Sequence, residues 1–477
     1  MPKNRFSSHD DFIPSLCSVL GSQFRRYWRQ HRPLRFLPLA FLACILLFVF
    51  RLLHIQYSTY GLPLIGLPQN NSPARLHLLI PVTTPTILFC KSWASAIIAN
   101  YPPPVLINYG EQFAKPKLSH GAKLSGAAEF LRNPPAPIGH WASGDLVLFA
   151  DGFDVWYQLP PDVMIRRYLS HFLQSTPVNA SAPQSPDPVV FGADKFCWPN
   201  KADSLPCQLA PQSPLPPDAW GPEPTGKKDP NKRLPPRFLN SGTVLGSWRG
   251  MREIYERAAR KAHDTVKGGG EVLSDQGVLA EVWGEDLSRQ RSNAAAKADD
   301  GAVAHADEEG LGIVMDYESK LFMTMTHSHD DLTWGLVNTT TTTTSPGSDS
   351  DPDSGDLASA LFPISPLPGQ LHLATNIITS HIPALLHFNG PKFPLGDETK
   401  PGWFGRMWWF HLLPEKKEKR ETGEYAKALF ERARSGEAGL KGARGTAGAW
   451  TDKGEWLEWK DVCGEWDFVG KGGVWDI

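Results

Sequence analysis

Two aspartates three residues apart are the first side chains in this sequence whose types and spacing suggest chemistry. The stretch VLFADGFDVW places Asp151 and Asp154 directly after an apolar run of strand length. Side chains at positions i and i+3 of a straight strand face opposite sides, so both carboxylates reach one point only if the chain turns between them. Gly152 makes such a turn easy. Two close carboxylates repel each other, so a divalent cation with oxygen ligands would stabilise the pair. The pattern alone leaves two interpretations open, a cation site and a solvated Asp-Gly turn.

The elements that position this pair alternate between strands and helices. Apolar runs of strand length are LHLLIPV, PVLINYG, DLVLFA, PVVFGAD, RFLNSGTVLG and LGIVMD. Helical patterns are TILFCKSWASAIIAN and SWRGMREIYERAARKAHDTV, the second rich in strong helix formers. This alternation predicts an α/β fold with a largely parallel sheet. Ligands of such open sheets bind at the carboxyl ends of the strands, which is where Asp151 and Asp154 lie.

Five polar blocks follow the aspartate pair along the chain. They are, in order, VVFGADKFCWPN, RFLNSGTVLG, LSDQGVL, IVMDYESKLF and LLHFNGPK. Together with the Asp-x-x-Asp strand end, this ordered set resembles the glycosyltransferase domain of the procollagen lysyl hydroxylases and related collagen-type glycosyltransferases. The resemblance covers about residues 76–395 apart from the insertions, and it is strongest to a fungal-type, membrane-anchored member.

The resemblance implies a GT-A fold, which is a Rossmann-like mixed, mostly parallel sheet flanked by helices. It also implies a UDP-sugar as the donor and Mn²⁺, or another divalent cation, as the cofactor. Asp151 and Asp154 match the metal-binding aspartates, and His387 matches the third protein ligand. The imidazole of His387 suits a transition metal better than Mg²⁺. Taken alone, a histidine at a strand end is more often a structural residue.

The same resemblance places Asn240 and Asp275 at polar positions that face the sugar or the acceptor. Asp275 is the stronger catalytic candidate, because a carboxylate can act as a base or stabilise positive charge at the anomeric carbon. A helix N-terminal carboxylate, favoured there by the helix dipole, is an equally good interpretation of Asp275. In the implied mechanism the cation neutralises the departing diphosphate while an acceptor hydroxyl attacks the anomeric carbon.

Four further residues are expected to support the site. Asp316 is expected to order it from behind the ligands, and Trp198 to stack on a sugar or to pack into the pocket wall. Lys123 and Lys392 are expected to reach a phosphate. Lysyl hydroxylases continue into an iron-dependent dioxygenase domain, and we expect no such domain after residue 395.

The N-terminal residues predict a membrane anchor. Residues 1–35 carry an excess of Lys and Arg, and the apolar run at 36–53 would form a helix of about 27 Å. Because the basic residues precede the span, we expect a cytoplasmic tail (1–35), a signal anchor (36–53), a stem (54–75) and a lumenal domain. A cleaved signal peptide and a buried core helix are the alternatives. The expected location is the Golgi or endoplasmic reticulum membrane, as a single-pass type II protein.

Glycosylation triplets and cysteines agree with a lumenal domain. The N-x-S/T triplets begin at Asn70, Asn179 and Asn338. An even set of cysteines after the span permits disulfides in an oxidising compartment. They are Cys90, Cys197, Cys207 and Cys463, of which Cys197 and Cys207 are the nearest pair in sequence.

Composition limits the partners and marks the less regular segments. The 48 Lys and Arg balance 50 Asp and Glu, which argues against a nucleic-acid partner. The expected partners are a nucleotide-sugar donor, a protein or glycan acceptor and the membrane. Stretches near 288–310 and 339–356 are poor in large apolar residues and are predicted to be disordered surface insertions. The Trp-rich extension at 396–477 is expected to pack in a core rather than to form a sugar-stacking or membrane-facing surface.

Two rival functions remain open. HSHDD contains His329-x-Asp331, a pattern used by iron(II) dioxygenases, although a surface loop is the favoured interpretation. The second rival is a lumenal protein with a GT-A-like fold that binds sugars or partners without transferring anything.

Overall fold

The structure is a computed structural model that describes residues 75–114, 118–142, 144–173, 186–221, 234–300, 310–338, 370–390, 404–411, 419–435 and 448–476. The predicted tail, the predicted anchor and the stem up to residue 74 lie outside these ranges. So do Lys392, Asn70, Asn179 and the threonine-rich insertion. The described residues belong to a single compact unit. Among the helices of these described ranges, none has the length and apolar character that crossing a bilayer requires.

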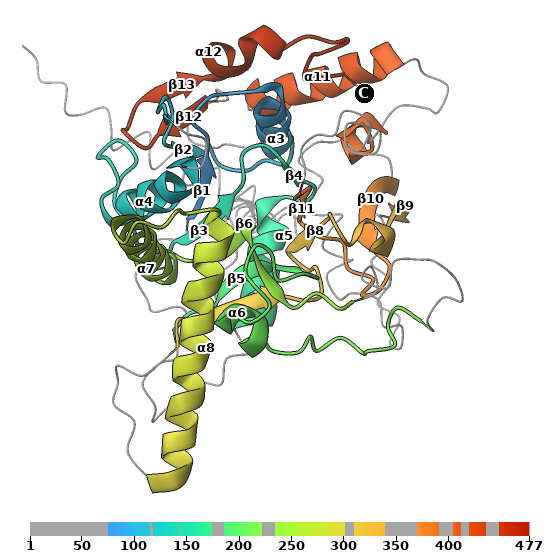
Figure 1. Cartoon of the computed structure of the whole chain (residues 1–477). Coiled ribbons are helices and arrows are strands. Elements are labelled where there is room, and N and C mark those ends of the chain that lie inside the picture. Colours follow the sequence, from blue (N-terminus) through green and yellow to red (C-terminus); the bar gives the residue numbers. More distant parts are fainter. Residues whose placement is uncertain are drawn as a thin grey trace, which may run out of the picture. The chain divides into compact units, whose positions relative to one another are not determined.

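An eight-stranded mixed sheet forms the centre of the fold. Its strands are β1 (Leu76–Pro81), β2 (Val105–Ile107), β3 (Leu146–Ala150), β5 (Val189–Asp194), β6 (Phe238–Ser247), β7 (Ile313–Asp316), β12 (Gly448–Thr451) and β13 (Trp456–Glu458). Their spatial order is β13-β12-β2-β1-β3-β6-β5-β7 (Figure 1). β6 is antiparallel to both of its neighbours and β13 is antiparallel to β12, whereas the other neighbouring pairs are parallel. The α/β prediction with a largely parallel sheet is confirmed.

Two smaller sheets and a set of helices surround this sheet. The three-stranded sheet contains β4 (Val155–Tyr157), β11 (Leu385–His387) and β8 (Phe322–Thr324), and the two-stranded one contains β9 (Leu332–Asn338) and β10 (Gln370–Asn376). The helices are α3 (Ile87–Ile98), α4 (Leu118–Arg132), α5 (Pro161–Arg167), α6 (Leu205–Leu209), α7 (Trp248–Lys267), α8 (Asp275–Asp300), α11 (Lys419–Ser435) and α12 (Trp459–Cys463). Short helical turns are η3 (Tyr168–Leu173), η6 (His329–Asp331), η8 (Trp408–Phe410) and η9 (Gly464–Trp466).

Both faces of the central sheet are covered, because successive residues of each strand point to opposite faces and both sets are apolar. Leu79 and Phe149 pack in one core cluster, which includes side chains of α4, α7 and α8. Leu78 and Leu148 pack in the other, with side chains of α3, α11 and α12. This two-sided burial gives the fold its Rossmann-like layering of helix, sheet and helix.

The described residues between 404 and 476 contribute to the same core. β12 lies parallel to β2, and β13 closes that edge of the sheet. A disulfide joins Cys90 in α3 to Cys463 at the end of α12. Four of the described tryptophans of this region are buried, as expected for a core, whereas Trp450, Trp456 and Trp466 are partly exposed. The fully buried ones are Trp408, Trp409, Trp459 and Trp475.

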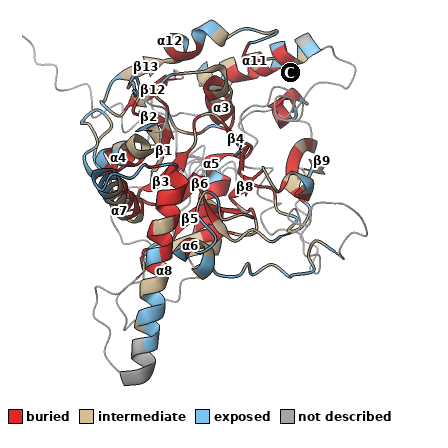
Figure 2. Cartoon of the chain, in the orientation of Figure 1, coloured by how far each residue is buried: buried red, intermediate tan, exposed pale blue. Residues whose placement is uncertain are grey.

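The prediction of disorder for one insertion is partly wrong. Residues 288–310 were expected to be disordered, but α8 continues as a helix to Asp300. Figure 2 shows that the first turns of α8 are buried and that the later turns are more exposed. This segment has few large apolar residues that could be buried, yet it is rich in Ala, the strongest helix former. A segment without a core-facing side can therefore extend an existing helix, because the buried turns have already nucleated it.

Candidate metal centre

The turn expected after β3 is present, and it needs Gly152. Asp151 directly follows β3, and β4 begins directly after Asp154. A Cβ atom on Gly152 would lie 2.8 Å from the carbonyl oxygen of Pro81, so a larger residue would push the turn away from β1. Asp154 is buried and Asp151 is partly exposed. The reversal at Gly152 therefore brings two carboxylates to one end of β3, at the carboxyl edge of the sheet.

Strand pairing places His387 beside this turn. β11 runs antiparallel to β4, with His387 opposite Val155. The next backbone N–H, that of Phe388, donates a hydrogen bond of 2.7 Å to the carbonyl oxygen of Asp154. As a result, Nε2 of His387 lies 3.5 Å from Oδ2 of Asp154 and 3.8 Å from Oδ2 of Asp151.

These three side chains fit a divalent cation. One ligand atom from each of Asp151, Asp154 and His387 lies within 4.8 Å of the others. Two ligands bound to one ion at about 2.1 Å lie roughly 3–4 Å apart, which matches the separations from His387. Two carboxylates and an imidazole are a donor set that suits Mn²⁺ and related ions. Within the described residues this is the only group of three such side chains.

Gly242 leaves the space that the histidine needs. A Cβ atom on Gly242 would lie 2.0 Å from Cε1 and 2.4 Å from Nε2 of His387, so the imidazole would have to move away. The backbone of Gly242 also accepts a hydrogen bond of 2.8 Å from the N–H of Asp151. The glycine thus contacts two of the three candidate ligands.

A bulge in β6 turns the Asn-Ser-Gly block toward the site. The pairing of β5 with β6 shifts register between Phe191, opposite Val244, and Gly192, opposite Asn240. The residues between these two partners on β6 are Ser241, Gly242 and Thr243. Bulges of this kind redirect side chains and often lie beside active sites.

Asp275 is the first residue of α8, which is the helix N-terminal position expected for it, while its catalytic role stays a prediction. Its carboxylate accepts a hydrogen bond of 3.0 Å from Ser241 and pairs with Lys123 at 2.6 Å and with His120 at 3.4 Å. Burial would raise the pKa of Asp275, but the neighbouring Lys123 ammonium and His120 hold that pKa well below its usual range.

Lys123 is engaged by carboxylates rather than open to a phosphate. Its Nζ lies 2.5 Å from Oδ1 of Asp151 and 2.6 Å from Oδ2 of Asp275. Burial would lower the pKa of Lys123, but the two carboxylates raise it above its usual value. The ammonium therefore links the metal-binding turn to the start of α8.

Asn240 is buried, and the protein occupies both ends of its amide. Its Nδ2 donates to Asp194 at 3.3 Å, and its Oδ1 accepts from the N–H of Gly242 at 3.1 Å. The same oxygen of Asp194 accepts a 3.0 Å hydrogen bond from Asn389, in the block that follows His387. These contacts favour Asn240 as a residue that shapes the bulge.

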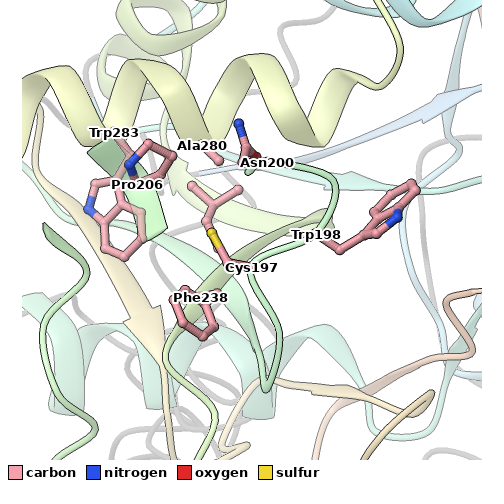
Figure 3. Close-up of a pocket in the computed structure, with 8 residues that line it drawn as sticks. Cys197, Trp198, Asn200, Pro206, Phe238, Ala280 and Trp283 are labelled. Atoms are coloured by element: carbon pink, nitrogen blue, oxygen red, sulfur yellow. The ribbon is translucent and has the colours of Figure 1, made fainter. Parts of the chain in front are cut away.

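Trp198 lies on the surface beside α8. Its side chain is 63% exposed, and its carbonyl oxygen accepts a hydrogen bond of 2.5 Å from Gln276, the residue after Asp275. Figure 3 shows a small pocket lined by Pro206, Phe238 and Trp283, with the Trp198 ring directed away from these residues. The ring therefore does not pack in the core, and its stacking on a sugar stays a prediction.

Asp316 orders the turn that leads into β8. Its carboxylate accepts backbone hydrogen bonds from Lys320, Leu321 and Phe322 at 3.0, 2.6 and 2.8 Å. β8 lies beside β11, with Thr324 opposite His387. Burial raises the pKa of Asp316 to about 6, against the effect of these donors. Asp316 thus supports the strand next to the histidine, in line with the expectation that it acts from behind the ligands.

The side chains of the His329-x-Asp331 pattern make contacts within the protein rather than forming an iron site. Asp331 forms a buried ion pair with Lys195 at 2.6 Å and accepts a hydrogen bond of 3.0 Å from Nε1 of Trp220. His329 pairs with its neighbour Asp330 at 3.2 Å. The Asp331 carboxylate is therefore committed to a cation and an indole of the protein.

Several residues at the site were quoted in the sequence blocks without a role. Ser241, Gly242, Gln276 and Asn389 belong to these blocks, and His120 lies outside them. His120 precedes Lys123 by three positions, a spacing that places both on one face of a helix. That spacing was the available signal, but it becomes visible only once α4 is recognised as a helix.

Comparison with known proteins shows a distant relation. No protein-family model matches the chain. Over 115 residues, 24% of this chain, it is 24% identical to the multifunctional procollagen lysine hydroxylase and glycosyltransferase of Caenorhabditis elegans. The match spans 11% of the length of that relative. The chain is thus distantly related to that group of proteins.

Proposed function

We propose that this protein is a metal-dependent glycosyltransferase of the GT-A type, which moves a hexose from a UDP-sugar to a hydroxyl group of a protein or glycan acceptor. The observation that carries the proposal is the cluster of Asp151, Asp154 and His387 at the carboxyl edge of the sheet, with Asp275 beside it. The distant relation to a hydroxylase and glycosyltransferase supports transfer chemistry.

The three clustered side chains would hold Mn²⁺ or another divalent cation. When bound, such an ion binds diphosphate oxygens and stabilises the charge of the departing nucleotide. Asp151 and Asp154 supply the carboxylates, and β4–β11 pairing fixes the imidazole of His387 against them. Gly242 keeps the space for that ring open.

Asp275 is better suited to stabilise charge than to accept a proton. Its depressed pKa, caused by Lys123 and His120 against the effect of burial, keeps it ionised and makes it a weak base. Sugar transfer develops positive charge at the anomeric carbon. An ionised carboxylate fixed by Ser241 is suited to stabilise that charge or to orient the acceptor hydroxyl.

The acceptor side would lie toward β5 and α8. Trp198 offers an exposed aromatic face next to Gln276, which suits stacking on a sugar ring. Lys392 stays a candidate for a phosphate contact, because it follows the Asn389 block in sequence.

We place this activity in the secretory pathway, with the chain anchored by residues 36–53 and the described unit in the lumen of the Golgi or endoplasmic reticulum. Two disulfides, Cys90–Cys463 and Cys197–Cys207, support an oxidising compartment. Protease added to intact microsomes should remove an epitope tag at the N-terminus, because this topology places the tag on the cytoplasmic side. Protection of the tag from the protease would contradict this topology.

The test is UDP release by the purified full-length chain. Mn²⁺ should support release from one of UDP-glucose, UDP-galactose, UDP-glucuronic acid and UDP-N-acetylglucosamine, and EDTA should abolish it. Asp275→Asn should lower the rate by about a hundredfold or more while leaving UDP affinity within about threefold. Asp203→Asn, at an exposed position, is the matched control and should leave the rate unchanged.

One result would overturn the proposal, and a second would overturn the role given to Asp275. Absence of metal-dependent release from every donor, with UDP still bound, would favour the non-catalytic binding protein. Release that is equal in wild type and Asp275→Asn would remove that residue from the chemistry.

A further inference from the structure

Lys123 lies between the candidate metal centre and Asp275. Its Nζ contacts Oδ1 of Asp151 and Oδ2 of Asp275, and its side chain is only 13% exposed. The two carboxylate oxygens of Asp151 therefore have different neighbours, because Oδ1 contacts Lys123 and Oδ2 lies near His387. Lys123 comes from α4 and Asp275 from α8, so these contacts bring distant parts of the chain together.

The formal charges of the three carboxylates are offset when Lys123 is counted with a divalent cation. Asp151, Asp154 and Asp275 together carry three negative charges. A divalent cation at the first two and His387 offsets two of them, and the Lys123 ammonium offsets the third. Facing carboxylates without a cation between them are strongly unfavourable. The Lys123 position is thus one that the protein has to fill with positive charge.

The surroundings of the ammonium repeat the donor types of the first site. Oδ1 of Asp151 and Oδ2 of Asp275 face it, and Nδ1 of His120 lies 3.4 Å from the other oxygen of Asp275. The first group also consists of two carboxylates and an imidazole, but within the described residues only the atoms of that first group lie close enough together to hold an ion as they stand. Asp151 belongs to both sets, as a bridging carboxylate does in centres that hold two metal ions.

We infer that Lys123 is a positioning residue that serves as the permanent second cation of this centre, which limits the site to one metal ion and keeps Asp275 out of its ligand set. The inference rests on the cation site of the proposed function. The Lys123 ammonium occupies the space between Asp151 and Asp275 in which a second metal ion would bind. The Asp275 carboxylate is therefore not a metal ligand and stays available for the sugar, while Asp151 binds the metal. The two carboxylates are thereby divided between two tasks.

Removal of the ammonium should create a second metal site. In Lys123→Ala the carboxylates of Asp151 and Asp275 would face an open space with His120 beside them. Mn²⁺ would enter that space, because it relieves the repulsion that Lys123 normally offsets. Lys123→Arg retains the charge and should keep the site single.

The experiment counts Mn²⁺ ions per chain by isothermal titration calorimetry and by electron paramagnetic resonance, without nucleotide or sugar. We expect one ion in wild type, two in Lys123→Ala and one in Lys123→Arg. Two neighbouring Mn²⁺ ions would also show spin–spin coupling, which a change in folding alone does not produce. Thermal unfolding with and without Mn²⁺ checks folding, and Lys123→Ala should gain more stability from Mn²⁺ than wild type does.

The outcomes separate this inference from the proposed function. One ion in both wild type and Lys123→Ala would overturn the inference and leave the first site intact. No ion in wild type would remove the cation site on which both rest. If Lys123→Ala folds only with Mn²⁺ present, counting ions in the refolded protein decides the matter in the same way.

Discussion

At the scale of single residues, the geometry of the site depends on two glycines as well as on the candidate ligands. Gly152 and Gly242 each occupy a position where a Cβ atom would collide with a neighbour. The first collision would be with the backbone of Pro81 and the second with the ring of His387. These glycines have no side chain that could bind a metal or react, yet they determine where the three candidate ligands can lie.

Gly242→Ala tests this directly. The added methyl group would displace the imidazole of His387, so Mn²⁺ affinity should fall by about tenfold or more, as expected for loss of a ligand or its support. Gly335→Ala is the matched control, since a Cβ atom there meets nothing within 4 Å. Titration calorimetry with Mn²⁺ measures both, and unchanged affinity in Gly242→Ala would contradict the described packing.

Asp316 gives a prediction about pH. Burial raises its pKa in the folded protein to about 6, above the usual value of an unfolded aspartate near 4. The folded state therefore binds this proton more tightly, so its stabilisation is complete below about pH 4 and is lost as the pH rises through about 6. Lowering the pH from 7 to 5 should stabilise wild type by about 1 kcal/mol relative to Asp316→Asn. Urea unfolding at both pH values measures this difference, and a constant difference would contradict the raised pKa.

At the scale of elements, most strands of the central sheet could be predicted, whereas the short strands around His387 could not. Apolar runs predicted β1, β2, β3, β5, β6 and β7, and helical periodicity predicted α3 and α7. β4, β8 and β11 have only three residues each, too few to show a period. α4 was missed because its sequence, LSHGAKLSGAAEFLR, has few large apolar residues to mark a face.

These short elements are the ones that assemble the site. His387 reaches the aspartates through pairing between β4 and β11, which are more than 200 residues apart in sequence. Such pairing is a tertiary event that no local pattern encodes. The ligand set was therefore available only through the family resemblance, whereas the turn at Gly152 followed from the residues themselves.

The two disulfides should differ in their effect on stability. Cys90–Cys463 closes a loop of 373 residues and Cys197–Cys207 a loop of 10. In the chain-entropy model the first bond stabilises by about 6 kcal/mol and the second by about 3 kcal/mol. Replacing Cys90 and Cys463 by Ser should therefore lower Tm more than the same change at Cys197 and Cys207. Calorimetry compares the two variants, and an equal or reversed order would contradict the role assigned to the C-terminal segment.

At the scale of the whole molecule, the C-terminal residues complete the sheet that carries the site. β12 extends the sheet beside β2, and Asp452, directly after β12, accepts a hydrogen bond of 2.7 Å from the N–H of Asn108. The carboxyl ends of β12, β2, β1 and β3 therefore share one edge. The burial of the Trp-rich segment was predictable from its aromatic content, but its place in the sheet was not, because β12 and β13 lack a distinctive pattern.

The central claim is that a cation held by Asp151, Asp154 and His387 binds the diphosphate of the donor. The most direct test is calorimetry of UDP binding to wild type and to Asp154→Asn, each with Mn²⁺ and with EDTA. We predict that wild type binds UDP with Mn²⁺ and that EDTA or Asp154→Asn weakens binding by about tenfold or more, as for loss of a metal ligand. Equal UDP affinity with and without the cation, or in Asp154→Asn and wild type, would contradict the claim.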